Sequence, residues 1–211
     1  MSSTLALSAT RHGAWIERIR KPLSAAFFVC WLLLALFTRP PGGEVWWREA
    51  LEFAGFFLLI AAALGRVWAF AYIGGRKNRE LCQSGPYALS RNPLYFFSFL
   101  GAAGACLALQ SLALLAITVP AFLLYYDAVM AAEERRLDAL FGADFVRYRA
   151  FVPRFWPRLA RPERQGSIQL DVGLFTRGLS EVFWFLAFIV AAELIEWCHA
   201  HQLWTLWAQP F

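Results

Sequence analysis

The chain has 211 residues, of which 59% are hydrophobic and only 17% are charged, and its mean hydropathy is +0.47. Soluble domains contain roughly 45–50% apolar and about 25% charged residues. This composition excludes a disordered, fibrous or disulfide-based protein and argues against a soluble enzyme. The 10 Trp, 20 Phe and 6 Tyr are typical of chains anchored at membrane interfaces. We therefore expect one membrane domain over residues 1–211, of the all-α class.

The apolar segments predict about five transmembrane helices. A helix needs about 20 apolar residues to cross roughly 30 Å of hydrocarbon. Residues 92–126 form an uncharged stretch of 35 residues, which as one helix would measure about 52 Å at 1.5 Å per residue. One crossing cannot use that length, so we expect a central helical hairpin that turns near Gln110-Ser111. The expected spans are 22–38, 51–73, 93–109, 112–132 and 178–199.

The basic residues indicate how these spans are oriented. They gather in the N-terminal arm, in the loop after the second span and in the stretch after the fourth, which together hold 17 of the 20 Lys and Arg. Such an excess marks the cytoplasmic side. We expect a cytoplasmic N-terminus and contact with membrane lipids rather than with nucleic acid. The four cysteines show no metal-ligand spacing, so we expect reduced structural thiols and no metal site.

Two polar segments flank the hairpin on that side, and the first runs from Gly85 to Tyr95. Gly85-Pro86 predicts a turn, and Pro93 suits the first turn of the third span with Asn92 as its cap. A helix N-terminus offers backbone N–H groups and a positive dipole end, so with Arg91 beside it this segment predicts an anion site. Alternatively, Arg91 only follows the bias of basic residues towards the cytoplasm and Asn92 only caps the helix.

The second polar segment begins with Glu133-Glu134 at the end of the fourth span. A helix C-terminus disfavours carboxylates, so a cationic group should compensate them, either a nearby arginine or a ligand. Apolar residues then recur at helical spacing, which predicts a cytoplasmic amphipathic helix on or returning to the membrane. These residues are Leu137, Leu140, Phe141, Phe145 and Tyr148.

In these two segments the chain resembles the integral-membrane methyltransferases that include isoprenylcysteine carboxyl methyltransferase and the phospholipid methyltransferases. The family pattern is Gly-Pro-Tyr-x-x-x-Arg-His/Asn-Pro-x-Tyr, a hairpin, Glu-Glu-x-x-Leu-x-x-x-Phe-Gly-x-x-Tyr-x-x-Tyr, and Val-Pro-Arg-Phe. The first part of the pattern continues after its second Tyr with x-Gly. The pattern is matched in order by residues 85–95 and 133–155, within a core of about 81–157. The isoprenylcysteine branch fits better. Three departures are Asn92 for the commoner His, Phe97 for a Gly and Phe145 for the first Tyr.

The resemblance implies S-adenosylmethionine bound at the cytoplasmic ends of the third and fourth spans. Arg91 and the helix start at Asn92 and Pro93 suit its carboxylate, and Glu133 or Glu134 suits its ammonium. The remaining expected site residues are aromatic or basic. Tyr87 and Tyr95 would line the adenosine pocket, while Arg154 and Tyr148 are the expected catalytic residues, with Arg154 orienting an anionic group of the acceptor.

The expected acceptor is lipophilic and enters from the bilayer as a prenylated thioether carboxylate, a lipid amine or another small hydrophobic compound. A competing hypothesis is an NADPH-dependent membrane reductase of the steroid 5α-reductase type, and another is a non-enzymatic helper or transporter. Inside the second span, Arg66 is expected to pair with Asp127, to line the site or to snorkel to the interface.

Overall fold

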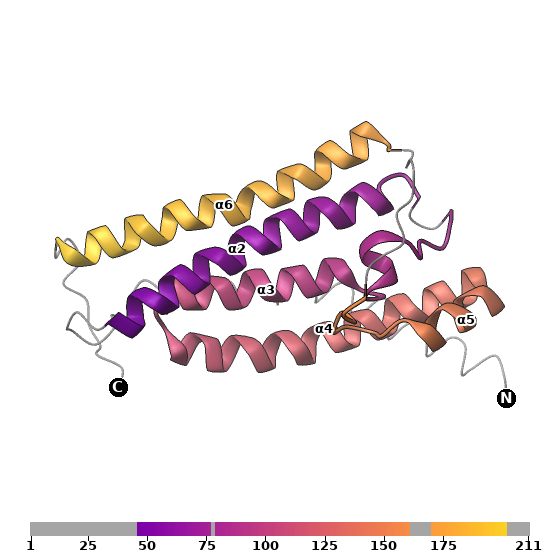
Figure 1. Cartoon of the computed structure of the whole chain (residues 1–211), viewed down its shortest axis with the longest axis horizontal. Helices are drawn as coiled ribbons and strands as arrows, with labels where there is room; N and C mark the ends of the chain where they lie inside the picture. The colour runs from indigo at the N-terminus through magenta and orange to yellow at the C-terminus, as the bar shows by residue number, and fades with distance from the viewer. Residues whose placement is uncertain (1–45, 77–78, 161–169, 202–211) are drawn as a thin grey trace, which may run out of the picture. The chain divides into compact units, whose positions relative to one another are not determined.

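The computed structural model describes residues 46–76, 79–160 and 170–201, and in this part of the chain all regular structure is helical (Figure 1). The all-α prediction is confirmed. The expected span over 22–38 lies outside the described residues. The elements in chain order are α2 (Trp46–Ile73), the short 3-10 helix η1 (Gly85–Ala88), α3 (Pro93–Ala108), α4 (Leu112–Phe141), α5 (Ala143–Phe151) and α6 (Val172–Ala200).

Three of these helices are long and apolar enough to cross a membrane, namely α2, α4 and the part of α6 from Gly178 to Ile195. The fourth apolar helix, α3, has 16 residues. The helices extend beyond the expected apolar stretches: α2 begins at Trp46, α4 ends at Phe141 and α6 begins at Val172. The extension of α4 follows from residues 133–141, which are mostly strong helix formers with no Gly or Pro.

The hairpin turns where the sequence predicts it. α3 ends at Ala108 and α4 begins at Leu112. Gln110 takes a positive φ of 53°, and the Ser111 hydroxyl accepts a hydrogen bond of 3.3 Å from the backbone N–H of Leu114 as the cap of α4. The Gln110 amide donates to the Glu52 carboxylate at 2.9 Å, which ties the turn to α2.

The amphipathic segment is divided at Gly142, whose φ of +49° ends α4 and starts α5. A positive φ is readily adopted only by glycine. The apolar residues on both sides of this break still pack together: buried Phe145, Tyr148 and Val152 contact the partly buried Leu81, Leu137 and Phe141. The stripe is therefore buried partly against the protein, under the loop that leads from α2 to α3.

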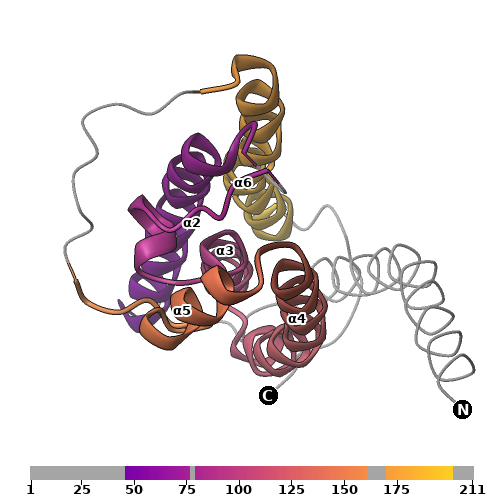
Figure 2. The ribbon, with the colours of Figure 1, turned by 90° about the vertical axis from the view of Figure 1, so that its right-hand side faces the viewer.

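Helix α3 lies at the centre of the bundle, with α2, α4 and α6 around it (Figure 2). Small residues let α2 and α3 approach closely. A Cβ on Gly55 would lie 2.3 Å from the backbone nitrogen of Ala108, and one on Gly65 would lie 2.2 Å from the ring of Phe97. Likewise, Gly101 of α3 receives the ring of Phe185 from α6. We call these contacts the glycine-lined interface.

Candidate functional site

The two polar segments singled out in the sequence are joined by backbone hydrogen bonds. The N–H of Arg91 donates to the carbonyl of Pro153 at 2.9 Å, and the N–H of Arg158 donates to the carbonyl of Leu89 at 3.0 Å. We call residues 152–158 the strap. Because segments about 60 residues apart lie side by side, the strap covers the beginning of α3.

Two polar side chains hold the strap in place. Ser90, which is 0% exposed, donates from its hydroxyl to the carbonyl of Phe155 at 2.9 Å. Asn92 donates from its side-chain amide to the carbonyl of Arg154 at 3.0 Å. Asn92 occupies the cap position before Pro93 but makes no side-chain capping hydrogen bond, so the predicted capping contact is wrong. Its side chain serves the strap because the strap carbonyl lies within reach.

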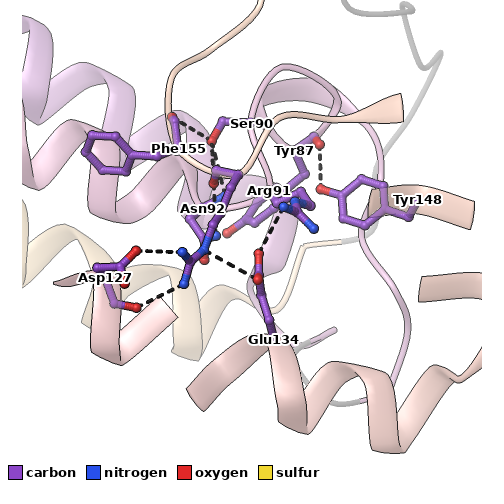
Figure 3. A network of polar contacts seen from close by, with 9 residues as sticks. Tyr87, Ser90, Arg91, Asn92, Asp127, Glu134, Tyr148 and Phe155 are labelled. Carbon is purple, nitrogen blue, oxygen red and sulfur yellow. Dashed lines mark hydrogen bonds and ion pairs between the residues drawn. The ribbon is translucent and has the colours of Figure 1, made fainter. Parts of the chain in front are cut away.

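Four charged side chains form a chain of ion pairs at the inner ends of α3 and α4, which we call the polar network (Figure 3). Glu134 contacts Arg91 at 3.3 Å (Oε1 to Nη2) and Arg154 at 3.4 Å (Oε2 to Nε). The two terminal nitrogens of Arg154 contact Asp127, one at its carboxylate and one at its backbone carbonyl at 3.0 Å. Asp127 and Glu134 are seven residues apart and so share one face of α4.

Only one of the two adjacent glutamates joins this network. Glu133 lies 4.0 Å from Arg136 on the same helix, whereas Glu134 points to the start of α3 and to the strap.

The expected ion pair between Arg66 and Asp127 does not form, since Asp127 pairs with Arg154. Arg66 instead donates to the hydroxyl of Ser98 and to the carbonyl of Leu94.

The three tyrosines expected at the site differ in the contacts that they make. The hydroxyl of Tyr148 donates to the backbone carbonyl of Tyr87 at 2.6 Å, and the ring of Tyr95 packs against Tyr126 with centroids 5.1 Å apart. Burial raises the pKa of both Tyr87 and Tyr148, so both phenols are neutral at physiological pH. In this structure Tyr148 makes a structural contact, and its catalytic role stays a prediction.

Several buried polar atoms at this site make no hydrogen bond within the described residues. They are the Tyr87 hydroxyl, Nε of Arg91, Oε1 of Glu134 and Nε of Arg154, although the last two belong to ion pairs longer than 3.2 Å. Buried polar groups are normally satisfied, and exceptions require an explanation. Positively charged donors of two arginines and a negatively charged acceptor of Glu134 thus lie close together here, as a ligand that carries both charges requires.

Sequence analysis missed the role of Ser90 and the partner of Asp127. Ser90 is a small polar residue beside Arg91, with no motif signal beyond its position. The spacing of seven residues places Asp127 on the same face of α4 as Glu134 and so towards the expected cofactor site, but it does not indicate the pair with Arg154. Phe97, which replaces a glycine of the family pattern, packs against Gly65 of α2, whereas Tyr95 two residues earlier faces α4 through Tyr126. A small residue on α2 accommodates the larger ring.

Metal ligands do not cluster in the described ranges 46–76, 79–160 and 170–201: no group of three His, Cys, Asp or Glu side chains there could hold an ion.

Comparison with known proteins supports the motif assignment. Residues 51–144 match the phospholipid methyltransferase family. The chain is 34% identical to the nickel-cobalt-cadmium resistance protein NccN of Alcaligenes xylosoxydans xylosoxydans, covering 89% of this chain and 84% of NccN. It is 35% identical to the cobalt-zinc-cadmium resistance protein CzcN of Cupriavidus metallidurans, covering 90% and 84%. No solved structure matches significantly. With both motif segments in contact at one site, the chain belongs to the phospholipid methyltransferase family of membrane proteins.

Proposed function

We propose that this protein transfers a methyl group from S-adenosylmethionine to a lipophilic acceptor that enters from the bilayer. The observation that carries the proposal is the convergence, around the start of α3, of buried polar atoms of both charges that make no hydrogen bond with any other residue the structure describes. Their chemistry fits the cofactor, which has a carboxylate, an ammonium and an adenosine group. Membership of a methyltransferase family supports the same reaction class.

The polar network supplies a partner for each end of the cofactor's amino-acid group. Arg91, together with the first turn of α3, suits the carboxylate, and Glu134 suits the ammonium. These two side chains pair with each other at 3.3 Å, and a zwitterion held by both would replace this one long ion pair with two charge-assisted contacts. Tyr87, whose buried hydroxyl makes no hydrogen bond, and Tyr95 are suited to the adenosine end.

Methyl transfer by in-line displacement depends on orientation and on exclusion of water more than on acid–base groups. When bound, the cofactor supplies a methyl group on a positively charged sulfur. The strap is fixed over the start of α3 by backbone and side-chain hydrogen bonds and is therefore suited to keep water away from the reacting groups. Arg154 lies on the strap with both terminal nitrogens engaged by Asp127, so its expected role in orienting an anionic group of the acceptor would require Asp127 to release it. The bias of basic residues towards these loops supports a cytoplasmic site.

Cofactor binding is the direct test. Calorimetry of the purified protein with S-adenosylhomocysteine should give micromolar affinity. Glu134→Gln should weaken it about tenfold, which corresponds to roughly 1.4 kcal/mol. Glu133→Gln is the matched control, because this neighbouring glutamate lies outside the polar network, and its affinity should change less than about twofold. Binding of NADPH instead of S-adenosylhomocysteine would indicate a reductase. Binding of neither compound would overturn the proposal.

The acceptor class can then be read from the product. Incubation with methyl-labelled S-adenosylmethionine and membrane lipids should yield label in the organic phase with wild-type protein and much less with Glu134→Gln. Alkaline hydrolysis separates the remaining possibilities, since a methyl ester releases labelled methanol whereas a methylated amine does not.

The names of the two relatives suggest the setting of this activity. Both are called resistance proteins for divalent metals, and we propose that methyl transfer by this chain supports the same kind of resistance. Expression in a metal-sensitive host should raise the tolerated cadmium or cobalt concentration. Glu134→Gln should abolish that gain at equal protein level, whereas full resistance with this variant would show that the phenotype does not depend on methyl transfer.

A further inference from the structure

Asp127 is the outermost member of the polar network and belongs to neither family motif. Its side chain is 64% exposed, compared with 22% for Glu134, 31% for Arg154 and 13% for Arg91. The network thus runs from a nearly buried arginine at the start of α3 to a carboxylate at the protein surface. A carboxylate on the surface of α4 has no need of a partner, so the ion pair that Asp127 makes with Arg154, together with the contact through its backbone carbonyl, calls for an explanation.

The geometry of Arg154 shows what Asp127 does. Both terminal nitrogens of this guanidinium are directed to Asp127, one to the carboxylate and one to the backbone carbonyl. Only Nε remains on the side of Glu134, at 3.4 Å and without a hydrogen bond. A guanidinium binds a carboxylate most strongly through two parallel N–H groups, and here these two groups are occupied by the carboxylate and the backbone carbonyl of Asp127.

Glu134 therefore stays only weakly engaged by Arg154. This matters because Glu134 contacts two arginines and, under the proposed function, must also receive the cofactor's ammonium. If Arg154 turned its paired edge to Glu134, it would compete with that ammonium for the same oxygens. Whether Arg154 competes with the ammonium therefore depends on which carboxylate it binds through its terminal nitrogens, that of Asp127 or that of Glu134.

We propose that Asp127 is a positioning residue that holds Arg154 away from Glu134 and so keeps the Glu134 carboxylate available to the ammonium group of the cofactor. This inference rests on the proposed function, and it names a residue and a role that the family motifs do not contain. It predicts that Asp127 influences the amino-acid end of the cofactor and leaves the adenosine end unaffected.

Two ligands separate these ends. S-Adenosylhomocysteine carries the ammonium and carboxylate groups, whereas 5′-methylthioadenosine lacks both. In calorimetry, Asp127→Asn should weaken S-adenosylhomocysteine binding about fivefold and change methylthioadenosine binding less than about twofold. Asp127→Glu, which keeps the charge, should restore most of the affinity. The matched control is Asp144→Asn, because Asp144 makes an exposed ion pair with Arg147 on α5 outside the network, and it should leave both affinities unchanged.

A double-mutant cycle shows whether the effect passes through Arg154. In an Arg154→Gln background, Asp127→Asn should change S-adenosylhomocysteine binding less than about twofold. An equal loss in that background would mean that the charge of Asp127 acts directly on the ligand and would overturn the positioning role. Equal losses for both ligands, or no loss for either, would also overturn it. Wild-type protein that binds neither ligand would instead overturn the proposed function itself.

Discussion

The two ends of α3 are built by opposite means. Its C-terminal half packs against α2 through the backbone contacts of the glycine-lined interface, where Gly55 approaches the backbone of Ala108 and Gly104 approaches that of α2. Its N-terminal end is covered by the strap, which is fixed by hydrogen bonds from Ser90 and Asn92. Close backbone packing leaves little room for a ligand, whereas directional hydrogen bonds can cover a site and leave charged groups unsatisfied within it.

This contrast shows how a small membrane protein separates stability from function. In a bilayer, helices associate through close packing because the surrounding lipid is as apolar as their side chains. Buried polar atoms without hydrogen bonds are costly, and under the proposed function those of the polar network are retained because the cofactor would satisfy them. The glycine-lined interface should therefore tolerate few changes in volume, while the strap and the polar network should tolerate changes that leave the fold intact.

The largest effect is expected at the backbone contact. Gly55→Ala would place a methyl group 2.3 Å from the backbone nitrogen of Ala108, so the two helices must separate. We expect a loss of about 2–3 kcal/mol in the free energy of unfolding, measured by denaturant titration in mixed micelles. Gly173→Ala is the control, because the nearest atom to its added methyl is 3.5 Å away. A stable Gly55→Ala protein would contradict the account of this interface.

The contact between Gly65 and Phe97 allows a related test, in which a second substitution should recover part of the lost stability. Gly65→Ala would bring a methyl group to 2.2 Å from the Phe97 ring and should cost about 1–2 kcal/mol by overpacking. Because the obstacle is a side chain, Phe97→Leu in the same protein should recover part of that loss. If the second substitution only adds to the damage, these two residues do not compensate each other.

Ser90→Ala tests the strap. It removes the hydroxyl that donates to the carbonyl of Phe155 and accepts from the N–H of Asn92. We expect a loss of about 1–2 kcal/mol in stability, since buried partners are left unsatisfied, together with weaker S-adenosylhomocysteine binding. Thr176→Ala on α6 removes a hydroxyl bonded within its own helix on an exposed surface and should alter neither. Unchanged binding in Ser90→Ala would show that the strap does not shape the site.

The smallest effect concerns Tyr148 and appears mainly at high pH. Burial raises the pKa of Tyr148, so the folded protein keeps this proton where the unfolded chain releases it. The associated stability is present below the ordinary tyrosine pKa of about 10 and is lost as the pH rises above it. Tyr148→Phe should flatten the fall of Tm above about pH 10 and cost about 1 kcal/mol at neutral pH through its lost hydrogen bond. An identical alkaline fall in both proteins would contradict this.

Much of the fold could be predicted because its signals are local. Uninterrupted apolar length gives the helices, Gln110-Ser111 gives the turn and Pro93 gives the start of α3. The fourth span was expected to end at residue 132, and the continuation of α4 to Phe141 as one helix was missed because the charged residues after Met130 end the apolar pattern, although helix propensity continues. The division at Gly142 was also missed, since an apolar stripe at helical spacing continues across it while the backbone changes direction.

The candidate site was predictable as a set of segments but not as a set of contacts. The order and spacing of the two motifs identified Arg91, Glu133, Glu134 and Arg154 as candidates. Neighbouring positions on a helix point about 100° apart, so sequence alone could not decide which glutamate faces the start of α3. The packing of α4 decides it in favour of Glu134.

By itself, the sequence determined a helical membrane protein with a central hairpin and two polar segments of a methyltransferase family, because length, hydropathy and turn residues act locally. Only the tertiary structure decided that Ser90 fixes the strap, that Asp127 engages Arg154 and that Phe97 packs against Gly65. These contacts join residues 27 to 65 positions apart and depend on how the helices are rotated against one another, which no local pattern encodes.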